Sequence, residues 1–172
     1  MAPSGPDIER LRLAEDPAGF VRRACPACSR QFKMPARGAD EPVLHAVFVL
    51  ALAHANAQEL PALPNRFCPY CGHAASAERF LTAAQREYVQ ARARATAGEV
   101  RYVQLKEVER HLDENPYLTF IPVPPEPAPG DLPPEPDDME AAPLLCCGGE
   151  LKLQASWRQP FFCPHCRARH GG

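Results

Sequence analysis

The cysteines are the residues whose spacing most clearly indicates chemistry in this chain. Three pairs are separated by two residues, namely Cys25–Cys28, Cys68–Cys71 and Cys163–Cys166, and a fourth pair, Cys146–Cys147, is adjacent. A proline follows the first cysteine of each spaced pair, and proline pre-sets a tight turn. Such a turn directs two thiolates at one ion, and two turns supply the four ligands of a tetrahedral zinc site. The pattern therefore predicts two zinc ions per chain.

The order of the cysteines divides them between the two predicted sites. Site one takes the first two pairs: Cys25, Cys28, Cys68 and Cys71. Site two takes Cys147, Cys163 and Cys166, with Cys146 as the expected fourth ligand. His170 is the alternative fourth ligand, because the spacing Cys163-x2-Cys166-x3-His170 also suits a metal. Gly72, directly after Cys71, is expected to adopt a positive φ where the chain leaves the turn.

Other uses of cysteine fit the sequence less well. The N-terminus lacks a secretory signal, so we expect a cytoplasmic protein with reduced cysteines rather than disulfides. The apolar run over residues 43–53 is too short to span a membrane. Redox CxxC chemistry favours a single motif in a βαβ context. Iron also suits four thiolates and would give a rubredoxin-like carrier, but the long gap between the pairs of site one argues against it.

The repeated Cys-Pro-x-Cys motif, with an aromatic residue before it in the second and third copies, resembles the zinc-ribbon superfamily. The residues that carry the resemblance are Cys25–Cys28, Phe67–Gly72 and Phe162–Cys166. The resemblance implies short β-hairpins around zinc and a role in binding nucleic acid or protein. The long segment between the first two pairs departs from a compact ribbon and implies an elaborated version.

Proline distribution and charge indicate the organisation of the chain. Ten of the 21 prolines lie between Pro116 and Pro143, in an acidic stretch. Such a composition predicts an extended spacer that cannot fold by itself. We therefore predict an α+β fold of small zinc-stapled domains: an elaborated zinc ribbon with helices over 1–115, a proline-rich acidic linker over 116–143, and a C-terminal zinc-ribbon hairpin over 144–172.

Local patterns predict the elements that hold the cysteines. Residues 7–16 indicate a short helix or an arm, and residues 41–60 a buried helix, although the run VFVL within it also suits a strand. Thr82 and Gln85 form a capping box, so a helix should run over 83–97, stop near Gly98, and be followed by a second helix over 99–113. Residues 150–157 alternate as a half-buried strand with Lys152 on its solvent face.

The sequence contains no catalytic motif, and two sites filled by protein ligands leave no position for a substrate. We therefore expect a protein that is not an enzyme and that binds neither a small-molecule substrate nor a membrane. We expect it to act as an adaptor that binds protein partners through two zinc-ribbon modules. The alternative is a nucleic-acid-binding protein, because the C-terminal module carries excess positive charge and aromatic residues; a rubredoxin-like redox protein is a third. The candidate nucleic-acid-binding residues are Arg86, Arg94, Lys152, Trp157, Arg158, Arg167 and Arg169.

Overall fold

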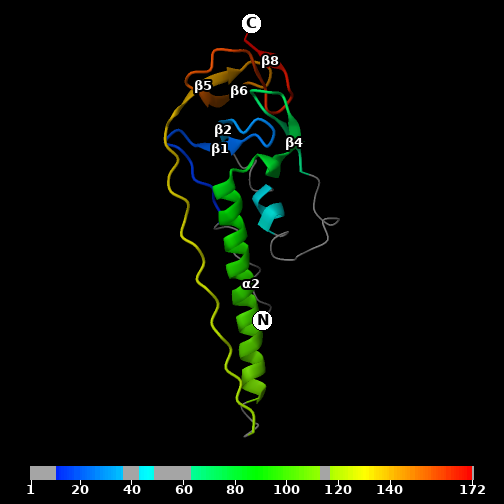
Figure 1. The fold of residues 1–172 in the computed structure, drawn as a ribbon, viewed down its shortest axis with the longest axis vertical. Helices are drawn as coiled ribbons and strands as arrows, with labels where there is room; N and C mark the ends of the chain where they lie inside the picture. The colour runs from blue at the N-terminus through cyan, green and yellow to red at the C-terminus, as the bar shows by residue number, and fades with distance from the viewer. Residues whose placement is uncertain (1–10, 37–42, 49–62, 113–116, 172) are drawn as a thin grey trace.

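The computed structural model describes residues 11–36, 43–48, 63–112 and 117–171 as a mixed α+β fold, as predicted (Figure 1). A four-stranded antiparallel sheet has the order β1-β2-β6-β5. Two short hairpins and a long helix accompany it. The bounds are β1 Phe20–Ala24, β2 Gln31–Pro35, β3 Asn65–Phe67, β4 Ala74–Ser76, the 3-10 helix η3 Ala77–Phe80, α2 Ala83–Leu112, β5 Met139–Leu144, β6 Gly149–Gln154, β7 Phe161–Phe162 and β8 Arg169–His170.

The strand pairings show that the strands and their turns form two equivalent halves. β1 pairs with β2 from Phe20↔Pro35 to Ala24↔Gln31, and the pairs of β5 with β6 from Met139↔Gln154 to Pro143↔Glu150 repeat that register, with Leu144↔Gly149 as one further pair. β3–β4 and β7–β8 form a second matched pair of hairpins. Lys33 of β2 pairs with Lys152 of β6, and these two residues occupy the same position in their hairpins. An approximate twofold axis therefore passes between these two lysines.

One sheet and one core join the two halves. β2 and β6 lie side by side at the centre of the sheet. A single buried cluster contains Cys25, Phe32 and Cys68 from the first half with Leu151 and Cys163 from the second. The sheet therefore unites segments that the sequence assigned to separate domains. β5 begins at Met139, within the range predicted as linker.

The opposite face of the sheet buries an ion cluster on the twofold axis. Asp16 Oδ2 lies 2.7 Å from Lys152 Nζ and 3.3 Å from Lys33 Nζ, and all three side chains are at most 6% exposed. Burial acts to raise the pKa of Asp16, but hydrogen bonds from Lys152 and from the amides of Phe20 and Ala18 outweigh it and lower the pKa to about 2. The prediction that Lys152 faces solvent is wrong, because Asp16 and Asp137 pair with its ammonium group on that face of the sheet.

α2 begins at the predicted capping box but does not stop where predicted. The Thr82 amide donates to Gln85 Oε1 and the Gln85 amide donates to Thr82 Oγ1, at 2.9 and 3.2 Å. The helix then continues through Gly98 to Leu112, where two helices were predicted. A mid-helix glycine costs only about 1 kcal/mol. At Gly98 it has a packing role, because a Cβ there would lie 3.0 Å from Cβ of Pro125.

Replacing Gly98 with alanine is therefore expected to lose its usual helix-stabilising effect. The new methyl group would press on Pro125, so the variant should be no more stable than wild type, instead of about 1 kcal/mol more stable. In a Pro125→Gly background, which removes the opposing Cβ, the same change should stabilise the protein. Chemical denaturation of the four proteins of this double-mutant cycle measures the difference. Equal effects in both backgrounds would refute the packing role of Gly98.

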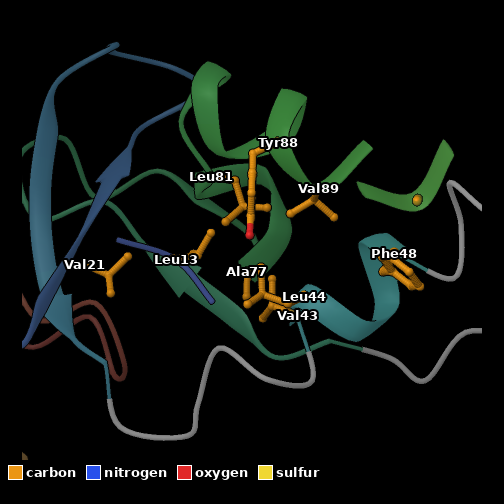
Figure 2. Close-up of a cluster of buried hydrophobic side chains, with 10 residues drawn as sticks. Leu13, Val21, Val43, Leu44, Phe48, Ala77, Leu81, Tyr88 and Val89 are labelled. Carbon is orange, nitrogen blue, oxygen red and sulfur yellow. The ribbon is translucent and has the colours of Figure 1, made fainter. Parts of the chain in front are cut away.

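A second buried cluster attaches α2 to the N-terminal half (Figure 2). Residues 43–48 are helical, which confirms that part of the predicted buried helix. Val43, Leu44 and Phe48 of this helix lie in the same cluster as Tyr88 and Val89 of α2. Residues 41–42 and 49–60 of that prediction lie outside the described residues. Of the short helix or arm predicted over 7–16, residues 7–10 also lie outside the described residues, and residues 11–16 form neither helix nor strand.

Residues 117–138, which we call the return segment, run extended beside α2 back to the sheet (Figure 1). Ion pairs anchor the part of the segment that leads into the sheet. Asp131 pairs with Arg92 of α2 at 2.9 Å. Glu135 and Asp138 pair with Arg22 of β1 at 2.6 and 2.7 Å. The acidic residues of this part therefore bind to the body of the protein, which the prediction of an extended spacer did not include.

Candidate metal centres

The first four-cysteine centre lies between the β1–β2 turn and the β3–β4 turn. The Sγ atoms of Cys25, Cys28, Cys68 and Cys71 all lie within 4.8 Å of one another. Two of these distances, Cys25 to Cys71 and Cys28 to Cys68, are 3.7 Å. A tetrahedron with metal–sulfur bonds of about 2.3 Å has edges of about 3.8 Å. The sulfurs thus occupy the corners that a tetrahedral metal ion requires.

The second centre has the same shape in the second half of the fold. Cys146, Cys147, Cys163 and Cys166 form the group. The sulfur of Cys147 lies 3.6 to 3.7 Å from each of the other three, and Cys166 lies 3.5 Å from Cys146. A disulfide would bring two sulfurs to about 2.05 Å. All eight cysteines are instead unbridged.

The turns share one backbone conformation. The residue after the second cysteine has a positive φ in each: 59° at Ser29, 68° at Gly72, 63° at Gly148 and 64° at Arg167. Its amide donates to the carbonyl oxygen three residues before that cysteine, as from Gly72 to Cys68 at 2.9 Å. The positive φ expected for Gly72 is confirmed. Because Ser29 and Arg167 adopt it too, the turn imposes this conformation even where glycine is absent.

The adjacent cysteine pair is a modified copy of this turn. The Gly148 amide donates to the carbonyl of Leu144 at 2.8 Å, so Leu144 stands where the other turns have their first cysteine. Leu144 is 1% exposed and fills the core. Leu144 has no sulfur to bind a metal, so Cys146, inside the turn, supplies the first ligand sulfur instead. The adjacent spacing is therefore the way this turn supplies two sulfurs.

His170 lies beside the second centre. Its Nε2 is 3.1 Å from the Sγ of Cys146, and its ring stacks on Phe161 at 5.2 Å. The four-sulfur group is complete without it. His170 is thus placed to hydrogen-bond the sulfur of Cys146, a contact that orients metal ligands in proteins.

Backbone amides and burial set the acidity of the thiols. Burial raises the pKa of Cys68, although the amides of Cys71 and Tyr70 donate to its sulfur. At Cys25 burial also acts to raise the pKa, but the amides of Cys28 and Ala27 outweigh it and lower it. Four neighbouring thiols cannot all ionise without a positive charge between them. A dication supplies that charge and ionises its thiol ligands outright.

Metal affinity should therefore depend steeply on pH. Protons compete for thiols whose pKa is raised, such as Cys68, so zinc binding should release protons and weaken as the pH falls from 8 to 5. Calorimetry in buffers of different ionisation enthalpy counts the protons released per zinc ion. Affinity that stays constant over this range would contradict thiolate ligation.

Hydrogen bonds and ring contacts connect the two centres directly. The amide of Phe67 donates to the carbonyl of Pro164 at 3.0 Å, and the amide of Phe162 donates to that of Pro69 at 2.8 Å. These are the residues flanking the first cysteine of the Cys68 and Cys163 turns. The guanidinium of Arg167 lies 5.9 Å from the Phe67 ring. Each turn thus supports the other across the approximate twofold axis.

The candidate nucleic-acid residues do not all remain available. Lys152 is 5% exposed and paired with Asp16, so it is not accessible to a ligand. Trp157 is half-buried, edge-to-face with Tyr70 at 4.8 Å, and Arg30 covers its ring. The remaining candidates are exposed and belong to two separate elements or their loops, namely Arg86 and Arg94 on α2, and Arg158, Arg167 and Arg169 near β7 and β8.

Comparison of the chain with models of protein families, with curated proteins and with solved structures found no match. No helix in the described ranges is long and apolar enough to cross a bilayer. The duplicated arrangement of strands and turns, found only in the structure, had two signals in the sequence. Cys28 and Cys147 are each followed five residues later by a lysine, Lys33 or Lys152, and Phe67 and Phe162 each precede a Cys-Pro.

Proposed function

We propose that this chain is a non-catalytic adaptor whose fold depends on two structural zinc ions and which binds a protein partner. Four sulfurs around each ion leave no position for water or substrate, which is the arrangement of structural rather than catalytic zinc. Zinc is the metal that most often takes four cysteine ligands at these distances. The zinc ions thus stabilise the fold, and the partner protein binds to another surface.

The observation that carries the adaptor role is an exposed apolar stalk. We define the stalk as α2 residues 99–112 with residues 117–125 of the return segment, which project away from the sheet (Figure 1). Seven of the eight large apolar side chains that are exposed in the described residues lie on it. They are Val100, Val103, Val108, Tyr117, Leu118, Ile121 and Val123. Such a concentration of apolar side chains marks a surface that another protein covers.

The test uses a triple variant, Val100→Gln, Val103→Gln and Val108→Gln. Glutamine is a good helix former and these positions are exposed, so the fold and zinc content should not change. Tagged wild type, purified from its own cells, should retain a protein partner in constant ratio, and the variant should lose it. A control with Arg101→Gln and Gln104→Ala, exposed polar sites on the same stretch, should retain it.

The outcomes separate the adaptor from the nucleic-acid alternative. A partner retained equally by wild type and stalk variant would remove the stalk from the binding surface. Absence of any protein partner, together with salt-dependent binding to nucleic acid, would favour the alternative. Loss of zinc in the stalk variant would show that its effect was on folding.

A further inference from the structure

The duplicated fold places a groove at the same position in each half. In the second half a groove of about 450 Å³ is lined in part by Ala142, Leu153, Gln154 and Phe161. In the first half a groove of about 260 Å³ is lined in part by Arg23, Met34, Pro35 and Arg66. The strand registers make these two sets of four residues positional equivalents. The two grooves can therefore be compared directly.

The chain covers the first-half groove with its own segment. Ala77 and Phe80 of η3 line that groove, and both are buried. The Phe80 ring packs edge-to-face on Phe32 at 6.0 Å. Just beyond η3, the Gln85 side chain donates to the backbone carbonyl of Arg22 in β1 at 2.9 Å. A short helical turn thus closes this side of the first half.

The second-half groove has no such cover among the described residues. Trp157 forms one wall of this groove. Glu140 and Arg158 stand together at the rim, 3.4 Å apart, so the rim does not favour an anion such as a phosphate.

We propose that the second-half groove binds a segment of a partner protein that is built like residues 76–85 of this chain. The segment is a short helical turn that places an aromatic side chain on Leu153 and Ala142. The proposal rests on the adaptor function and names a second contact, separate from the stalk. It predicts a partner contact that recognises shape and apolar side chains rather than charge.

Trp157 makes the test direct, because it is the only tryptophan in the chain. The probe is a synthetic peptide of residues 74–90, which carries η3 and the first turns of α2, added to the zinc-loaded full-length protein. Saturable binding should shift the Trp157 emission to shorter wavelength. A peptide with Phe80→Ala should bind at least about tenfold more weakly, equivalent to about 1.4 kcal/mol.

Two protein variants locate the binding. Ala142→Tyr fills the groove with a residue that strands favour and should weaken peptide binding by at least about tenfold. Ala155→Tyr makes the same exchange at an exposed turn position outside the groove and should leave binding unchanged. Both variants should keep their zinc and, through the stalk, the partner of the adaptor, so failure here is distinguishable from failure of the proposed function.

Three results with the peptide would overturn the proposal, and one result without it. The first is no emission change at millimolar peptide, and the second is equal binding of the Phe80→Ala peptide. The third is equal binding by the Ala142→Tyr protein. A concentration-dependent dimer that shows the emission shift without peptide would also overturn it, because the occupant would then be a second copy of the chain.

Discussion

Replacing Cys68 by serine is expected to weaken zinc binding at both centres, although Cys68 belongs to the first alone. Cys68 is 0% exposed and shares one buried cluster with Cys163 of the second centre. The turn that follows it accepts a hydrogen bond from Phe162, at Pro69. Loss of zinc from the first centre should therefore loosen the support of the second. Structural zinc contributes on the order of 10 kcal/mol to small domains.

Coupling of this kind has a measurable size and a required symmetry. In the Cys68→Ser variant, the second centre should bind zinc at least about tenfold more weakly than in wild type, equivalent to about 1.4 kcal/mol. By linkage, zinc bound at one centre must help the other by the same factor. Cys163→Ser, its positional equivalent, should therefore weaken the first centre comparably. Competition with a chromophoric chelator measures both affinities.

Independent centres would behave differently. Cys68→Ser could leave the second centre at full zinc affinity, with a separate unfolding transition for each half. In that case the shared sheet and the hydrogen bonds between the turns would contribute no coupling free energy between the centres. The single-core account would then be wrong even if both centres bound zinc.

Replacing Asp16 by asparagine is expected to destabilise the fold by about 1.5–3 kcal/mol, the usual contribution of hydrogen bonds to charged groups. The cost stays below that of an unpaired buried charge, because Lys33 keeps Asp138 and Lys152 keeps Asp137 as partners. Lys33 and Lys152 both contact Asp16 Oδ2, and the side chains of Asp16 and Lys33 are 0% exposed. Asparagine keeps an oxygen for the amides of Ala18 and Phe20 but removes the charge. Chemical denaturation at fixed free zinc gives the difference in free energy of unfolding.

A surface control and a pH series test the reason for this effect. Glu107→Gln breaks the exposed Glu107–Arg110 pair and should cost at most about 1 kcal/mol. Because the pKa of folded Asp16 is lowered to about 2, its contribution is complete above the unfolded value near 3.9 and is lost as the pH falls toward 2. The Asp16→Asn deficit should thus stay constant from pH 6 to 8. A deficit under 1 kcal/mol would show that the cluster is not electrostatically important.

The sequence was informative where a single local rule decides the structure. Cysteine spacing predicted both four-sulfur groups, since a two-residue turn can direct its thiolates in only a few ways. The capping box at Thr82 and Gln85 predicted where α2 begins, because both partners lie within one turn. The helix over 43–48 followed from composition and length.

The sequence failed where distant segments decide the structure. Strand alternation places the side chain of Lys152 on the other face of the sheet from Leu151 and Leu153. It does not show that Asp16 covers the face on which Lys152 lies. The sequence predicts a helix end at Gly98, and only the structure shows that the glycine makes room for Pro125. The return segment reads as a spacer because its acidic residues find their basic partners only in the folded protein. The role of Leu144 emerges only when the two halves are compared.

The central claim is that metal held by eight cysteines makes this fold possible, and metal analysis of the native protein tests it most directly. Protein purified without added metal should contain two zinc ions per chain and should lose its fold, seen by circular dichroism, when a strong chelator removes them. A chain that stayed folded without metal, or whose cysteines were joined by disulfides, would contradict the account.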